Sequence, residues 1–207
     1  MDTHHRPSRE VRTAPVTASS ADARKVLIVT FVWFLVACGV GAAGLLRAAR
    51  PPLPQVMIAG LTIVILIAFW RPTSFRRWAL GVDLRAIVLI HVSRFVGIYF
   101  LVLYGRGELP YAFAVPGGWG DIAVAFTAGA ICLLARPGIG PRRGVVIAWN
   151  IFGLVDIVLV VVTATRLGLA DPSSMRALLQ LPLSLLPTFL VPIIIATHII
   201  IFARLAR

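Results

Sequence analysis

Six apolar stretches dominate this 207-residue chain, and each has the length of one helix crossing roughly 30 Å of hydrocarbon. Because a bilayer core holds no water, the backbone groups of each stretch must pair internally, as they do in an α-helix. The predicted fold class is therefore all-α, a polytopic membrane protein with six transmembrane helices. We expect these helices near residues 26–46, 53–70, 86–104, 119–135, 144–164 and 181–203. A mean hydropathy of +0.92 with only 14% charged residues excludes an ordinary soluble domain.

The chain divides into a tail and one domain. Residues 1–24 are rich in Arg, Ser, Thr, Ala and Pro and lack apolar periodicity, which predicts a disordered cytoplasmic N-terminal tail. Residues 25–207 are predicted to form a single six-helix transmembrane domain. The first apolar run has spanning length and is followed by Arg47 and Arg50, so we expect an uncleaved helix rather than a signal peptide.

The distribution of basic residues predicts the orientation. With the N-terminus inside, only five of the 20 Lys and Arg residues fall outside: Arg47, Arg50, Arg106, Arg166 and Arg176. Arg94 lies within a helix, so the other fourteen fall inside. This bias predicts an N-in/C-in topology. The same pattern argues against nucleic acid as the partner of a chain with net charge +12, because the basic clusters separate apolar runs and form no aromatic-interleaved face. The predicted partner is the lipid bilayer.

Six polar side chains within the apolar stretches are the candidates for a functional site: His91, Arg94, Asp121, Asn150, Asp156 and His198. Such residues are costly in hydrocarbon, so they usually face the protein interior and pair. At about 1.5 Å per residue, His91, Asn150 and His198 each lie roughly 9 Å from the inner end of their helix. Asp156 and Asp121 lie roughly 18 and 22 Å in, with the supporting residues Tyr99 and Thr188 at similar height. Trp149 is a further supporting residue beside Asn150.

Helical spacing and charge suggest how these residues meet. His91, Arg94 and Gly97 recur every three residues, as do Asn150, Gly153 and Asp156, so each set covers an arc of about 120° that suits a cavity. Because Arg94 cannot remain unpaired in hydrocarbon, Asp156 or Asp121 is its expected partner. A structural reading stays open, in which these residues are only ion pairs and interhelical hydrogen bonds.

Two segments of the chain, residues 109–121 and the proline-containing last helix, are predicted to depart from a regular helix. Residues 109–121 are apolar, bounded by proline and broken by glycine, so this segment is a candidate to dip into the outer leaflet before the fourth helix. Asp121 would then stand in the first helical turn, as an N-terminal cap or as a site residue. Pro182, Pro187 and Pro192 predict a kinked last helix with unpaired carbonyls, which neighbouring Ser184 and Thr188 could accommodate.

Four motifs in chain order resemble an uncharacterised family of small bacterial integral membrane proteins with six helices. The motifs are His91-x-x-Arg94, Pro116-Gly-Gly-Trp-Gly-Asp121, Trp149-Asn150-x-x-Gly153-x-x-Asp156, and Pro187-Thr-Phe-Leu-Val-Pro192 followed by His198. The resemblance covers the chain from about His91 to its end and implies no established activity. It does imply a multi-pass protein of the bacterial cytoplasmic (inner) membrane.

The leading functional hypothesis is proton- or ion-linked transport of a small solute through the polar site of helices three to six. Six helices are few for a carrier, an objection that a homo-oligomer would answer. A membrane oxidoreductase is the alternative, with non-covalent haem b held by His91 and His198. A metal-dependent hydrolase needs Asp156 beside both histidines, which their depths disfavour, so no metal site is predicted. A non-catalytic membrane subunit also stays open, so whether the chain is an enzyme is undecided.

Overall fold

The computed structural model describes residues 19–134 and 142–207, which are helical and contain no strand. Six helical segments in this part of the chain are long and apolar enough to cross a membrane, which confirms the predicted number. They are Ser20–Ala42 (α1), Leu53–Trp70 (α2), Leu84–Gly105, Tyr111–Leu134 (α6), Arg143–Ala170 (α7) and Leu186–Leu205. The third joins α4 (Leu84–Leu89), the 3₁₀ segment η1 (Ile90–Phe95) and α5 (Val96–Gly105). The sixth joins the π-helical turn η3 (Leu186–Leu190) and α8 (Val191–Leu205).

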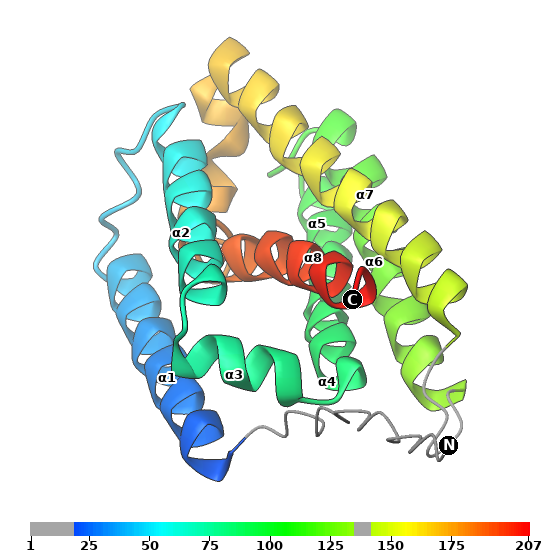
Figure 1. Cartoon of the computed structure of the whole chain (residues 1–207). Coiled ribbons are helices and arrows are strands. Elements are labelled where there is room, and N and C mark those ends of the chain that lie inside the picture. The colour runs from blue at the N-terminus through cyan, green and yellow to red at the C-terminus, as the bar shows by residue number, and fades with distance from the viewer. Residues whose placement is uncertain (1–18, 135–141) are drawn as a thin grey trace, which may run out of the picture.

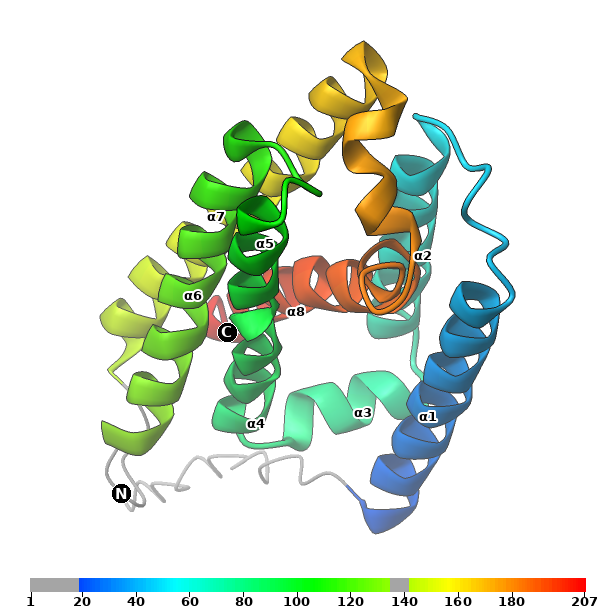
Figure 2. The same cartoon turned by 180° about the vertical axis from the view of Figure 1, so that it is seen from behind.

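Two groups of helices stand on either side of α8. Helices α5, α6 and α7 pack together on one side, and α1 and α2 lie on the other (Figures 1 and 2). Helix α8 runs across the middle of the molecule and contacts both α2 and α7. More than half of the sixth span is buried, against 11% for the first and second, so α8 is the central helix. The polar residues Thr197 and His198 of α8 are accordingly buried in the protein interior.

Three helix starts differ from the sequence prediction by five residues or more, and one of them is the last span, which begins at Leu186 and not at residue 181. Residues 1–18 of the expected disordered tail, residues 1–24, lie outside the described residues. The last part of that range is helical, because α1 begins at Ser20. Its start is fixed by Ser19, whose hydroxyl accepts the Asp22 N–H in an N-cap. Helix α6 begins at Tyr111, well before the expected residue 119.

The short amphipathic helix α3 (Ser74–Gly81) joins the ends of three long helices through its arginines and its carbonyls. It lies across one end of the molecule, between α2 and α4 (Figure 1). Arg76 donates to the carbonyls of Phe69 and Trp70 at the end of α2, a favourable place for a cation. Arg77 forms two bonds with Asp22 of α1. Arg204 of α8 donates to the Ala79 carbonyl at 3.0 Å.

The prolines of the last span interrupt its helix, as predicted. Pro192 has no N–H to bond the carbonyl of Thr188, four residues earlier. The indole N–H of Trp33 in α1 donates to that carbonyl at 2.9 Å instead. The Thr188 hydroxyl donates to the Ser184 carbonyl at 2.7 Å. A neighbouring helix and a local hydroxyl thus satisfy the interrupted backbone.

Candidate functional site

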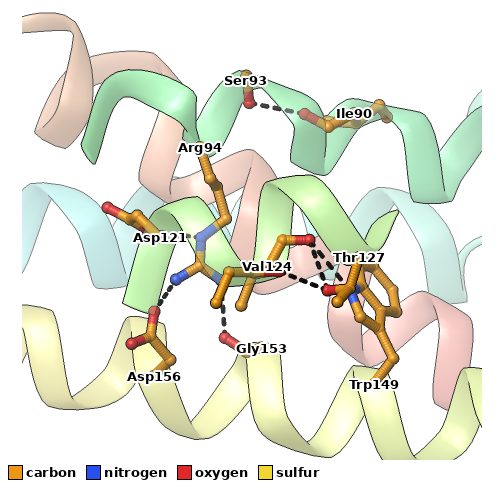
Figure 3. Close-up of polar contacts among 10 residues, drawn as sticks. Ile90, Ser93, Arg94, Asp121, Val124, Thr127, Trp149, Gly153 and Asp156 are labelled. Atoms are coloured by element: carbon orange, nitrogen blue, oxygen red, sulfur yellow. Dashed lines mark hydrogen bonds and ion pairs between the residues drawn. The ribbon is translucent and has the colours of Figure 1, made fainter. Parts of the chain in front are cut away.

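Arg94 lies in the middle of the molecule with no exposed surface. Its Nε donates to Asp121 Oδ1 at 2.6 Å, its Nη1 to the Gly153 carbonyl at 2.8 Å, and its Nη2 to the Asp156 carboxylate (Figure 3). Sequence reasoning expected one carboxylate partner, whereas the structure brings both to the same guanidinium. We call Arg94, Asp121 and Asp156 the Arg94 triad.

The Arg94 triad has unequal formal charges. One guanidinium faces two carboxylates, so the group carries a net charge of −1 whenever both carboxylates are ionised. Only 4% of the Asp121 side chain and 14% of the Asp156 side chain are exposed. An uncompensated charge in such surroundings is costly. The triad can balance its charge by holding one proton or by taking up another cation.

The 3₁₀ segment η1 explains how two long polar side chains of the third span face the same way. Residues three apart differ by 60° around an α-helix but coincide in a 3₁₀ helix. His91 and Arg94 are three apart and both lie in η1, so their side chains leave the helix on one face. The hydroxyl of Ser93 donates to the Ile90 carbonyl at 2.6 Å, a local bond that competes with regular helix geometry.

Glycines let the helices that carry the triad approach closely. A Cβ atom on Gly118 of α6 would lie 2.9 Å from the Gly97 carbonyl oxygen of α5, and a Cβ on Gly97 would meet the Gly118 carbonyl. This crossing is one turn from both Arg94 and Asp121. On α7, a Cβ on Gly153 would lie 2.6 Å from Cε1 of His198. The Gly153 backbone therefore bonds Arg94 and also leaves the space that the His198 ring fills.

The two histidines of the long apolar helices touch each other. The ring centroids of His91 and His198 are 4.2 Å apart, and neither residue is exposed. The Trp149 ring packs edge-on against His91 at 5.0 Å. Asn150 donates to the His198 carbonyl at 3.0 Å, and its Oδ1 lies 2.7 Å from His198 Nδ1. We call His91, Asn150 and His198 the histidine layer; its three members meet, as their calculated depths predicted.

Hydrogen bonding assigns a tautomer to each neutral imidazole. The Asn150 oxygen can only accept, so His198 Nδ1 carries the hydrogen. The Thr197 hydroxyl donates to the Ile193 carbonyl at 2.8 Å, so it accepts from His91 Nε2 at 3.2 Å. The remaining nitrogens, His91 Nδ1 and His198 Nε2, are buried and have no hydrogen-bond partner among residues 19–134 and 142–207. Each ring thus presents one free lone pair inside the protein.

The histidine layer does not fit a haem held between His91 and His198. With metal–nitrogen bonds of roughly 2 Å, two imidazoles on opposite faces of a porphyrin have centroids roughly 6 Å apart. The observed 4.2 Å leaves no room for the ring. This arrangement of the two rings gives the haem alternative no support. A hydrolytic metal centre has no better support, because no three His, Cys, Asp or Glu side chains of residues 19–134 and 142–207 are placed to hold a metal ion.

The predicted position of Asp121, in the first turn of its helix, is wrong. Helix α6 runs from Tyr111 through Pro116, so Asp121 lies well inside it and does not cap its N-terminus. The expected dip of residues 109–121 is likewise replaced by helix. Tertiary packing outweighs the poor helix propensity of this segment, since Gly117 and Gly118 bring α6 against α7 and α5.

The supporting residues have different placements. Trp149 packs against the histidine layer and also donates to the Val124 carbonyl at 3.2 Å (Figure 3). Thr188 donates to the Ser184 carbonyl just before the last span, and Tyr99 lines a cavity at the C-terminal end of α5. Sequence reasoning missed Thr197, although its position next to His198 was a signal.

These features define a class: an all-helical protein with six apolar helices of spanning length and a buried ionic cluster. Residues 51–206, about three quarters of the chain, match the family described as domain of unknown function DUF8737. The chain belongs to this family. The matched range contains the Arg94 triad and the histidine layer, and it leaves out α1. No curated protein and no solved structure matches the chain.

Proposed function

We propose that this chain is a six-span integral protein of a bacterial cytoplasmic membrane, with both termini in the cytoplasm. Residues 25–207 would form its single transmembrane domain and residues 1–24 its cytoplasmic tail. The six apolar helices support this proposal. So does the position of α3, whose Arg76, Arg77 and Trp78 suit a membrane surface and lie at the end where the arginine bias places the cytoplasm.

We further propose that the protein carries out proton-linked transport of a small solute, with the Arg94 triad as its proton-binding group. The observation that carries this proposal is the ratio of two carboxylates, one buried and one largely buried, to one guanidinium. Binding of one proton brings the charge of the triad to zero, and its release restores −1. A group that can alternate between these states inside a membrane suits coupling to a proton gradient.

Polar groups lie on both sides of the triad, although an apolar layer around Phe100 and Phe113 separates it from those near Tyr99. Gly153 links it to the histidine layer, since this residue contacts both Arg94 and His198. The unpartnered ring nitrogens of the two histidines add hydrogen-bond acceptors on the proposed cytoplasmic side of Arg94. Toward the other end of the molecule, Tyr99 stands on α5 roughly 7.5 Å beyond Arg94 and faces a polar cavity.

Proton flux into proteoliposomes tests the function. Purified protein is reconstituted around a trapped pH-sensitive dye, a pH gradient is imposed, and valinomycin with K⁺ compensates charge. We expect wild-type flux above that of empty liposomes and loss of this excess in Asp156→Asn. The control is Asp83→Asn, an exposed residue at which asparagine also caps α4. Equal flux in wild type and Asp156→Asn would refute the proposal.

A further inference from the structure

We infer that the cavity at the outer end of α5 binds a small zwitterion with an ammonium and a carboxylate group, such as an α-amino acid whose side chain is uncharged. This inference rests on the proposed function, because it names the solute class for that transport. The cavity has a volume of about 420 Å³, which is within the usual range of ligand sites. It lies between the end of α5 and the 3₁₀ helix η2 (Pro172–Leu179), at the end opposite α3 (Figure 2).

Opposite charges line the two sides of this cavity. Glu108 follows α5, and Arg176 lies on η2. Within the described part of the chain, neither side chain forms an ion pair. Both are therefore free to engage a ligand, Arg176 through a carboxylate and Glu108 through an ammonium group. Hydroxyl and amide groups of Tyr99, Ser173 and Gln180 complete the polar lining.

A helix-ending motif fixes the position of Glu108. Gly107 has φ +73°, and its N–H bonds the Tyr104 carbonyl at 2.9 Å. The Glu108 N–H bonds the Leu103 carbonyl at 2.9 Å. These two bonds and the left-handed glycine form a Schellman motif. The turn holds Glu108 at the cavity edge before any ligand arrives, which lowers the entropy lost on binding.

A second capping motif fixes the facing wall. Asp171 Oδ1 accepts the Ser173 N–H at 2.9 Å and the Ser173 hydroxyl at 2.7 Å at the start of η2. These bonds with Ser173, aided by the charge of Arg176, lower the pKa of Asp171 below its ordinary value. The Asp171 carboxylate is thus engaged within its own turn, and Arg176 stays available to the cavity.

The inner end of the cavity is closed toward the Arg94 triad. Leu103 and Leu183 form part of its lining, and both are buried in the apolar cluster around Phe100 and Phe113. Tyr99 packs against the same cluster. The structure therefore has the form expected of a solute site open at one end of the molecule and separated from the proton site by an apolar layer.

Binding to the purified full-length chain in detergent tests this inference. The probes are α-amino acids with uncharged side chains, and propionate and propylamine serve as analogues that carry only one of the two charges. Calorimetry measures their binding. We expect at least one amino acid to bind more tightly than both analogues. Loss of one charged hydrogen-bonding group is expected to weaken this binding roughly 10- to 100-fold in Arg176→Gln. Arg166→Gln, which removes an exposed arginine outside the cavity, serves as the control.

A selectivity change gives a second readout. In Glu108→Gln, binding of propionate should persist while the preference for the amino acid over propionate is lost. Glu108 and Arg176 are exposed, so both variants are expected to fold. Absence of binding by every amino acid, or equal binding by Arg176→Gln, would overturn the inference. Proton flux without amino-acid binding would sink this inference alone, whereas amino-acid binding without proton flux would sink the proposed function.

Discussion

Replacing Arg94 with methionine is the perturbation whose effect the structure predicts most fully. The guanidinium donates to two carboxylates and one carbonyl, and methionine replaces none of these bonds. Asp121 is 97% buried as a residue, so water cannot take over as its partner. Removing one member of a buried ion pair typically costs about 3–5 kcal/mol. For a chain of this size, that loss corresponds to a melting temperature lower by roughly 6–20 °C.

Thermal unfolding of purified protein in detergent measures this effect. Arg166→Met, at an exposed position on α7, is the control and should stay near the wild-type melting temperature. A second variant combines Arg94→Met with Asp121→Leu and Asp156→Leu. Because apolar replacement of a whole buried charge cluster is often neutral or stabilising, this variant should recover most of the lost stability but conduct no protons. An unchanged melting temperature in Arg94→Met would refute the reasoning.

Three further variants test the packing around the site, each by thermal unfolding in detergent. Gly153→Ala should cost about 1–3 kcal/mol of stability by overpacking, because the new Cβ would lie 2.6 Å from His198 Cε1. Gly129→Ala is the control and should be neutral, since a Cβ there has nothing within 4 Å. Equal effects of the two substitutions would contradict this. Trp33→Phe keeps the ring but leaves the Thr188 carbonyl unpaired, at about 1–3 kcal/mol; wild-type stability would count against that role. Asn150→Leu removes the acceptor of the His198 N–H and should cost about 1–3 kcal/mol, unless the histidine layer is held by packing alone.

Hydropathy predicted the six long apolar helices because a bilayer core would set strong constraints on their length. Helix length follows from membrane thickness, and the second span, Leu53–Trp70, agrees with the expected residues 53–70. That an aspartate pairs with Arg94 followed from the cost of a buried unpaired charge, although the sequence did not predict that both would do so. The contact of His91, Asn150 and His198 followed from counting residues along regular helices.

Irregular helix geometry was out of reach for the same reasoning. The 3₁₀ segment around His91 and the π-helical turn at Thr188 depend on tertiary contacts that periodicity does not encode. Asp121 was placed at a helix start because Pro116 and the glycines around it are poor helix formers. Those glycines instead permit the close packing of α6, a long-range effect. Trp33 was missed because its carbonyl partner lies 155 residues away.

Infrared spectroscopy of the purified protein tests the central claim, that the Arg94 triad exchanges a proton, most directly. The C=O stretching band of a protonated carboxylic acid is followed as the pH is changed. We predict a band that titrates in wild type and in Asp83→Asn and that disappears in Asp121→Asn or Asp156→Asn. Absence of any such band at every pH at which the protein stays folded would show that both carboxylates remain ionised, and would contradict the account.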